Sequence, residues 1–98
     1  MPKESRFQHA LIGKIKERFP DCVVMKNDAG YIQGIPDLTV LYRDRWATLE
    51  CKKSAKASHQ PNQDYYVEKM DQMSFSRFIF PENRDQVLNE LTNYFETD

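Results

Sequence analysis

Two acidic side chains and a lysine stand at spacings that can bring them together on neighbouring strands. Asp37 heads one apolar run, and Glu50 and Lys52 lie in a second, strand-like run. Because side chains alternate between the faces of a strand, Glu50 and Lys52 point to one face and Cys51 to the other. If the two runs pair, two carboxylates and an ammonium group converge. The pattern therefore predicts a site for a hard divalent cation with a positive charge beside it.

Each of these residues also has an ordinary structural explanation. Asp37 could be a turn residue that opens a strand, and Lys52 a surface lysine. Glu50 could form an ion pair with Lys52 or Arg45 on an exposed face. Taken together, two close carboxylates repel each other and are costly to bury unless a cation joins them, so the combination favours a metal site. Mg²⁺ suits it, because this ion needs only one or two carboxylates besides water and substrate phosphate.

Hydrophobic periodicity and turn residues predict the elements that carry these side chains. The segment 37–42 and the segment 45–53 are expected to form a hairpin. A hairpin followed by a helix and a further strand is typical of a mixed central sheet flanked by helices, the α/β class. The predicted elements are, in order, a helix over 3–18, strands over 22–26, 37–42 and 45–53, a helix over 61–73, a strand over 75–80 and a helix over 83–95.

The same periodicity predicts which side of each helix faces the interior. Each helix carries an apolar stripe at helical spacing. The expected inward residues are Phe7, Leu11 and Ile15 in the first helix, Tyr66, Met70 and Met73 in the second, and Val87, Leu88, Leu91, Tyr94 and Phe95 in the third.

Length and composition indicate one domain spanning 1–98. The chain has 98 residues, of which 40% are hydrophobic, as is ordinary for a globular protein. The charged N-terminal segment does not resemble a signal peptide, and no apolar run approaches the ~20 residues that span a bilayer. We therefore expect a soluble cytoplasmic protein with no membrane partner. Cys22 and Cys51 are interpreted as small buried hydrophobic residues rather than a disulfide or a zinc site.

Charge alone leaves a nucleic-acid partner open. The formal net charge of −1 argues against one, since nucleic-acid-binding domains are often basic. However, Lys52, Lys53 and Lys56 cluster directly after the Glu50 run, while acidic residues concentrate over 82–98. A basic face opposite an acidic one and ordinary solvated faces both fit this distribution.

The segments Pro36-Asp37 and Glu50-Cys51-Lys52, on the second and third predicted strands, resemble the PD-(D/E)XK nucleases. More narrowly, the chain is similar to the VRR-NUC branch, which includes short stand-alone bacterial and phage proteins. The resemblance runs from Glu4 to about Leu91 and implies a restriction-endonuclease-like αβββαβ core followed by a C-terminal helix. The further features that carry it are Glu4 in the first helix, Lys26-Asn27, the Gly-Ile-Pro-Asp segment at 34–37, and Gln63 in the helix after the Lys52 strand.

This resemblance implies metal-dependent hydrolysis of DNA phosphodiester bonds. Asp37, Glu50 and the main-chain carbonyl of Cys51 would bind Mg²⁺, with Mn²⁺ able to substitute, and Glu4 would complete the acidic cluster. Lys52 would act on the attacking water or the phosphate, and Gln63 would orient Lys52 or the substrate. Without the resemblance, Gln63 is a solvent-facing helix residue and Glu4 a first-turn acid favoured by the helix dipole. Cys51 departs from the pattern, since a larger apolar residue is usual at that position.

The resemblance also implies partners. Lys26, Lys53 and Lys56 would contact the DNA backbone, although Lys26 fits equally well as a surface lysine at a strand end. Stand-alone members of the branch resemble Holliday junction resolvases. This implies a homodimer acting on branched or four-way DNA in a bacterial or phage-infected cell. Candidate dimer contacts are Tyr65, Tyr66, Tyr94 and Phe95.

Two other classes of function remain open from the sequence. The chain could be a non-catalytic DNA-binding or interaction module that retains the nuclease fold. It could also be a structural protein-interaction domain with no affinity for DNA. The complete set of Asp37, Glu50 and Lys52 argues against the non-catalytic module, because a site that has lost its activity usually loses one of its residues. DNA binding that weakens as salt rises would exclude the structural domain.

Overall fold

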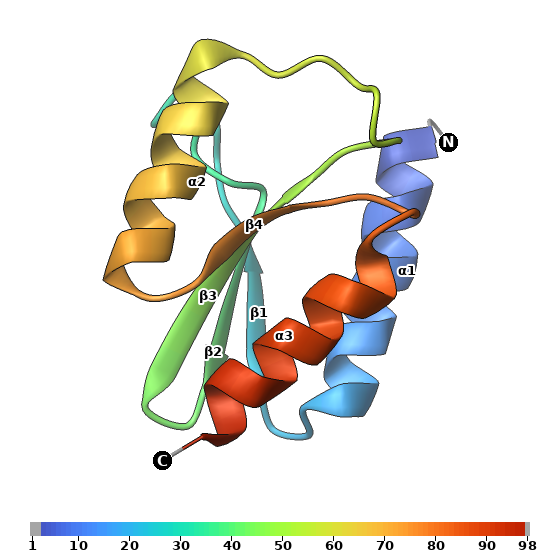
Figure 1. The fold of residues 1–98 in the computed structure, drawn as a ribbon, viewed down its shortest axis with the longest axis vertical. Helices are drawn as coiled ribbons and strands as arrows, with labels where there is room; N and C mark the ends of the chain where they lie inside the picture. The colour runs from blue at the N-terminus through green and yellow to red at the C-terminus, as the bar shows by residue number, and fades with distance from the viewer. Residues whose placement is uncertain (1–2, 98) are drawn as a thin grey trace.

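Three helices surround a four-stranded sheet in a computed structural model that describes residues 3–97, with the side chains of residues 5–97 (Figure 1). The predicted order and type of the elements are confirmed, although the strands are shorter at their ends than predicted. The elements are α1 (Lys3–Arg18), β1 (Val23–Lys26), β2 (Leu38–Tyr42), β3 (Arg45–Cys51), α2 (Pro61–Met73), β4 (Ser76–Ile79) and α3 (Arg84–Glu96).

The sheet is mixed, as predicted. Its strand order is β1-β2-β3-β4, with β1 and β3 antiparallel to β2 and with β4 parallel to β3. A tight turn at Arg43-Asp44 joins β2 to β3, and Arg43 adopts a left-handed φ of 58° there. The parallel pair requires a crossover, which the segment containing α2 supplies. These features place the chain in the α/β class.

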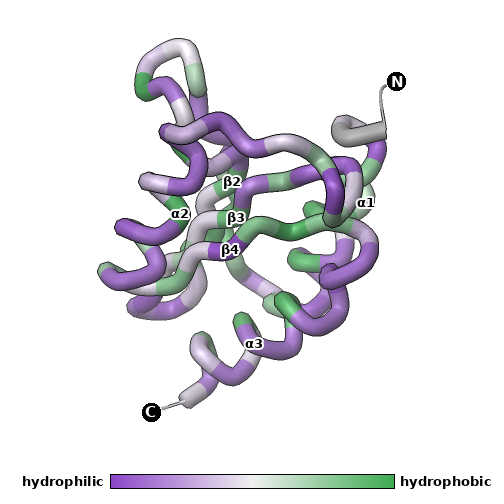
Figure 2. Tube along the Cα trace, turned by 45° about the horizontal axis from the view of Figure 1, so that its top comes forward, coloured by the Kyte–Doolittle hydropathy of each residue, from purple (hydrophilic) through white to green (hydrophobic). Residues whose placement is uncertain are grey.

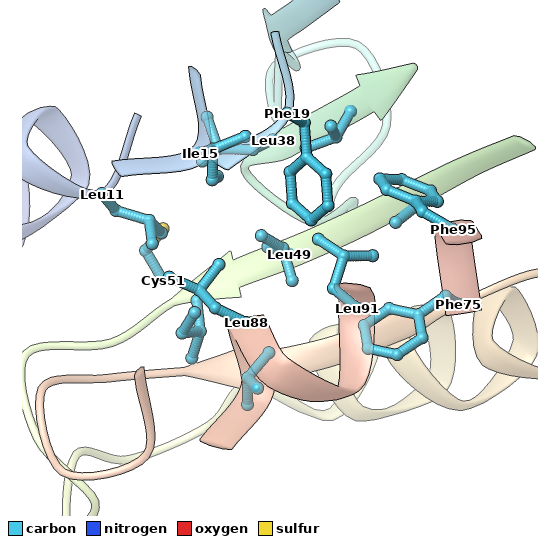
Figure 3. Close-up of a cluster of buried hydrophobic side chains, with 14 residues drawn as sticks. Leu11, Ile15, Phe19, Leu38, Leu49, Cys51, Phe75, Leu88, Leu91 and Phe95 are labelled. Atoms are coloured by element: carbon cyan, nitrogen blue, oxygen red, sulfur yellow. The ribbon is translucent and has the colours of Figure 1, made fainter. Parts of the chain in front are cut away.

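Helices α1 and α3 cover one face of the sheet and enclose the apolar core with it (Figures 1 and 3). The alternation predicted for β3 holds, since Ala47, Leu49 and Cys51 point into this core. Burying these side chains supplies most of the hydrophobic stabilisation of the fold. The core consists of Leu11, Ile15, Phe19, Leu38, Val40, Ala47, Leu49, Cys51, Phe75, Ile79, Val87, Leu88, Leu91 and Phe95.

An aromatic cluster closes one end of this core. Phe19 follows the last residue of α1 and is fully buried. Its ring centroid lies 5.2 Å from that of Tyr42 and 5.2 Å from that of Phe95. The chain turns away immediately afterwards, where Asp21 takes a left-handed φ of 74°. Sequence periodicity did not identify Phe19 as a core residue, because it lies beyond the end of the helix.

Helix α2 packs on the opposite face of the sheet, and this interface is polar. The tube of α2 is mostly hydrophilic in Figure 2. The Thr48 hydroxyl donates a hydrogen bond to the Ser76 hydroxyl at 2.7 Å and contacts the Met70 sulfur at 3.5 Å. The buried polar and charged residues among the described side chains all come from β3, β4 or the residue after β3, and they are Thr48, Glu50, Lys52 and Ser76.

One prediction about side-chain burial is wrong. Met73 was expected on the inner stripe of α2 but is 64% exposed, and Val67 is buried instead. Helix α2 therefore does not turn its most hydrophobic side fully toward the sheet. Phe95 is only 3% exposed and belongs to the core, which confirms its predicted inward orientation, and the adjacent Tyr94 is half-buried. A buried Phe95 offers no surface for the dimer contact that was also expected of it.

Cys51 lies in the core, and Cys22 is half-buried against it. Burial raises the pKa of the Cys22 thiol, which disfavours the reactive thiolate. Within residues 3–97, no helix has the length and apolarity needed to cross a bilayer.

Replacing Phe19 by alanine should lower the free energy of unfolding by about 3–5 kcal/mol, because it empties a fully enclosed aromatic site. Urea unfolding followed by circular dichroism measures this loss. Tyr31→Ala is the control. Since Tyr31 is 86% exposed, its truncation should change stability by no more than about 0.5 kcal/mol. Equal losses in the two variants would contradict the assignment of Phe19 to the core.

Candidate functional site

The register of the sheet aligns three side chains in a row on the face that α2 covers. Leu38 of β2 pairs with Leu49 of β3, so Asp37 stands opposite Glu50 at the next position. The backbone N–H of Cys51 donates to Oδ2 of Asp37 at 2.9 Å, which holds this carboxylate against β3. On the other side of β3, Glu50 is in register with Phe78 of β4. The row therefore runs from Asp37 through Glu50 to Phe78.

Glu50, Lys52 and Gln63 form one hydrogen-bonded group between β3 and α2. Oε2 of Glu50 lies 3.8 Å from Nζ of Lys52 and accepts a hydrogen bond from Nε2 of Gln63 at 3.1 Å. Nζ of Lys52 donates to Oε1 of Gln63 at 2.6 Å. The two charged side chains are only 3% and 9% exposed. Burying opposite charges is costly unless further hydrogen bonds satisfy them, and the Gln63 amide provides these bonds.

The Gln63 amide can be oriented in only one way. Its oxygen faces two donors, the Lys52 ammonium and the backbone N–H of Gln60 at 3.0 Å. Its nitrogen faces the Glu50 carboxylate, which only accepts. Gln60 is the N-cap of α2 and Pro61 its first residue, so Gln63 occupies the third position, where a capping side chain reaches back. One side chain thus caps the helix and joins the two buried charges.

A close backbone contact fixes the start of α2 beside this group. Gly34 has a left-handed φ of +90°, and a Cβ added there would lie 2.4 Å from the Asn62 Cβ and 2.7 Å from its carbonyl carbon. Only glycine allows the loop before β2 to approach the helix this closely.

Asn27 clamps the segment that presents Asp37. Its backbone N–H donates to the Asp37 carbonyl at 2.8 Å, and its side-chain amide donates to the Pro36 carbonyl at 2.9 Å. The same side chain exchanges hydrogen bonds with the Thr39 hydroxyl. Asp37 lies just before β2, where strand pairing alone does not constrain it, so this clamp contributes to its position.

The donor set fits a hard cation of the magnesium type. The Cys51 N–H points toward Asp37, and in an extended strand the carbonyl of the same residue points toward the same edge. Asp37, Glu50 and this carbonyl would supply two carboxylates and one neutral oxygen, a set that Mg²⁺ completes with water and phosphate. Within the part of the chain with described side chains, no three His, Cys, Asp or Glu residues gather closely enough to hold a metal. Glu4, the expected third acid, lies outside those side chains.

The lysines expected to contact DNA separate into two groups. Lys53 and Lys56 line a surface hollow of about 510 Å³ together with Lys52, Ala57 and Ser58. Lys26 is exposed at the end of β1, but its register partner is Leu38, whose side chain faces the α1 and α3 core. Cross-strand partners share a face, so Lys26 points away from the site.

A histidine that the sequence analysis did not single out lies beside the row. The ring of His59 stacks on Phe78, with centroids 3.9 Å apart and planes inclined by 15°. Its Nδ1 lies 2.9 Å from Oδ1 of Asp64. His59 immediately precedes the N-cap of α2, a position where an apolar side chain commonly packs. In the sequence, the pattern that could have identified this pair is a histidine just before the start of a helix, followed five residues later by Asp64.

Comparison with known proteins adds no family. No protein-family model matches the chain, and a search of curated proteins finds no match. The geometry of the site is therefore the basis for inferring function.

Replacing Gly34 by alanine should destabilise the protein by about 1–3 kcal/mol, because the new Cβ meets Asn62 and the backbone is left-handed. Gly13→Ala is the matched control. Gly13 lies in α1, and a Cβ there has no neighbour within 4 Å, so this change should stabilise the protein by about 0.5–1 kcal/mol. Urea unfolding of both variants measures the effect. A Gly34→Ala variant as stable as the wild type would show that the loop does not need this close contact.

Proposed function

We propose that this protein is a metal-dependent DNA endonuclease of the PD-(D/E)XK type, most similar to the VRR-NUC branch. The observation that carries the proposal is the joint position of Asp37, Glu50, Lys52 and Gln63 on one side of the sheet. Two carboxylates face each other across β2 and β3, and an ammonium group lies directly beside one of them. This combination suits hydrolysis of a phosphodiester, whose charge must be neutralised on both sides of the reacting phosphorus.

Each residue has a distinct role in this proposal. Asp37 and Glu50, with the Cys51 carbonyl, would hold Mg²⁺ or Mn²⁺, which when bound supplies Lewis-acid polarisation of the phosphate and of water. Lys52 would orient the attacking water or stabilise the charge that builds on the phosphate oxygens. Gln63 would hold the Lys52 ammonium in place, since its oxygen accepts from Nζ at 2.6 Å. Gln63 is thus a positioning residue.

The distribution of basic side chains supports DNA as the substrate. Lys53 and Lys56 border the hollow that continues from Lys52, where they can neutralise phosphates on either side of the one that is cut. The net charge of −1 is compatible with this, because only one surface needs to be basic. Because the protein as a whole carries no positive net charge, it would bind long uniform DNA weakly. A substrate that is recognised by its shape is therefore favoured.

A branched or four-way junction is the substrate shape that we propose, cut by a homodimer that presents two sites. Exposed apolar side chains on the sheet supply a candidate surface for self-association. Val23 is 51% exposed, Met25 43% and Leu41 38%, and Val23 pairs directly with Leu41. Tyr65, at 56% exposed, remains a candidate contact on α2.

Asp37→Asn should abolish metal-dependent cleavage while leaving the fold intact. The asparagine oxygen can still accept from the Cys51 N–H, whereas the charge that would bind the cation is lost. Lys52→Met should lower the rate by about 10²–10³-fold, because it removes the positive charge but keeps most of the apolar stem. Gel assays on linear, flap, splayed and four-way DNA with Mg²⁺ or Mn²⁺ measure cleavage, and EDTA should stop it in the wild type.

Circular dichroism controls for folding, since Lys52→Met leaves the Glu50 carboxylate buried without its lysine. Asp37→Asn alone carries the test if Lys52→Met does not fold. Wild-type protein that binds DNA but never cuts it would instead support a non-catalytic binding module. Cleavage retained in both folded variants would refute the proposed site.

Lys53→Ala and Lys56→Ala should each weaken DNA binding at low salt and reduce the slope of log Kd against log salt by about one. Fluorescence anisotropy with labelled DNA in Ca²⁺ measures this. Lys14→Ala, an exposed position on α1, is the matched control and should leave the slope unchanged. Equal effects at all three positions would indicate diffuse attraction rather than a defined path for the backbone.

A further inference from the structure

We propose that His59 donates the proton that the leaving oxygen needs when the phosphodiester is cut, and that Asp64 holds the imidazole for this task. The inference rests on the proposed nuclease function and deepens it, because it adds an acid to a site described so far only by its acidic ligands, lysine and glutamine. It depends on the position of His59, the orientation of its ring and the chemistry of the leaving group.

His59 lies at the end of the site row. Phe78 is in parallel register with Glu50, so the two side chains share a face of the sheet and stand on neighbouring strands, which lie about 4.8 Å apart. The imidazole stacks on the Phe78 ring at 3.9 Å and therefore lies on the face that carries the carboxylates. The backbone confirms this proximity. The N–H of the next residue, Gln60, donates to the Gln63 oxygen that also binds the Lys52 ammonium.

The ring is held by one nitrogen. Nδ1 contacts the Asp64 carboxylate at 2.9 Å, so this nitrogen is the donor and the proton available for transfer is on Nε2. The His59 side chain is 32% exposed, which leaves it accessible to a substrate. The charged side chain that contacts the ring is Asp64, in the first turn of α2.

Packing alone does not require a histidine here. The residue before a helix N-cap often packs an apolar side chain against its surroundings, and a phenylalanine would stack on Phe78 equally well. An imidazole oriented by a carboxylate, with its second nitrogen accessible, is instead the arrangement that proteins use to transfer protons. Lys52 and Gln63 already have other roles in the proposed reaction, since Lys52 acts on the water or the phosphate and Gln63 holds Lys52.

In the proposed step, water replaces the sugar oxygen on phosphorus and His59 protonates the oxygen that leaves. The oxygen of water forms a bond to phosphorus while the bond from phosphorus to the bridging sugar oxygen breaks. The Nε2 proton of the imidazolium moves to that leaving oxygen, which departs as an alcohol. The proton lost by the attacking water passes to solvent, and the neutral imidazole, still bonded to Asp64 through Nδ1–H, is reprotonated from solvent.

The decisive experiment compares oxygen and sulfur as leaving atoms in otherwise identical DNA. A thiolate leaves without a proton, so a substrate with sulfur at the leaving position, identified from the wild-type product ends, does not need the acid. His59→Phe keeps the stack on Phe78 but removes the proton donor. It should lower kcat on normal DNA by about 10²-fold with KM unchanged, yet cut the sulfur-containing DNA at nearly the wild-type rate.

Two variants sharpen this result. Asp64→Asn should show a smaller loss with the same dependence on the leaving atom, because it disturbs the orientation of the ring rather than removing it. His9→Phe changes the other histidine, exposed on α1, and should cut both substrates like the wild type. In the metal-free protein, long-range ¹H–¹⁵N NMR should place the proton of neutral His59 on Nδ1, and Asp64→Asn should shift this signal.

Equal losses of His59→Phe on both substrates would assign a structural role to His59 and overturn the inference. No loss on either substrate, or a proton of neutral His59 on Nε2, would also overturn it. A different result would refute the nuclease proposal itself. If the wild type hydrolyses neither DNA nor bis(p-nitrophenyl) phosphate with Mg²⁺ or Mn²⁺, the catalytic site itself is wrong and the inference fails with it.

Discussion

The amide of Gln63 joins a buried carboxylate to a buried ammonium, and the geometry of the whole site depends on this link. Glu50 and Lys52 lose their hydration under α2, a cost that folding tolerates only if both charges keep hydrogen bonds. Gln63 provides one bond to each and also accepts from the backbone at the start of its own helix. The position of α2 and the geometry of the charges are therefore fixed together, and a shift of the helix breaks both.

One face of the sheet packs against the apolar core, and the other carries the charged residues of the site. The alternation of side chains along β3 made this difference predictable. The apolar residues of β3 pack under α1 and α3, while Glu50 and Lys52 point toward α2, as expected from a period of two. The span of α1 and the span of α2 were also predicted correctly, because Pro20 and Pro61 mark their limits. The core thus supplies the stability that lets the other face carry buried charge.

The remaining features depend on contacts that a single sequence does not display. The buried side of α2 begins with polar Gln63 and continues through Val67, whereas the sequence pattern gave weight to Met73, which is exposed. A helix on a polar sheet face need not turn its most apolar stripe inward. Phe19 and His59 were missed because each lies just outside a helix, where periodicity carries no information and only the tertiary neighbour defines the role.

The proposed function requires Asp37 and Glu50 to bind a divalent cation together, and paramagnetic NMR can detect this binding. Substoichiometric Mn²⁺ should broaden the amide signals around Asp37 and over 50–52 first, while those of α3 stay sharp. The Asp37→Asn variant should lose this selective broadening. Broadening that begins at the acidic residues of α3, or that is unchanged by Asp37→Asn, would contradict the account.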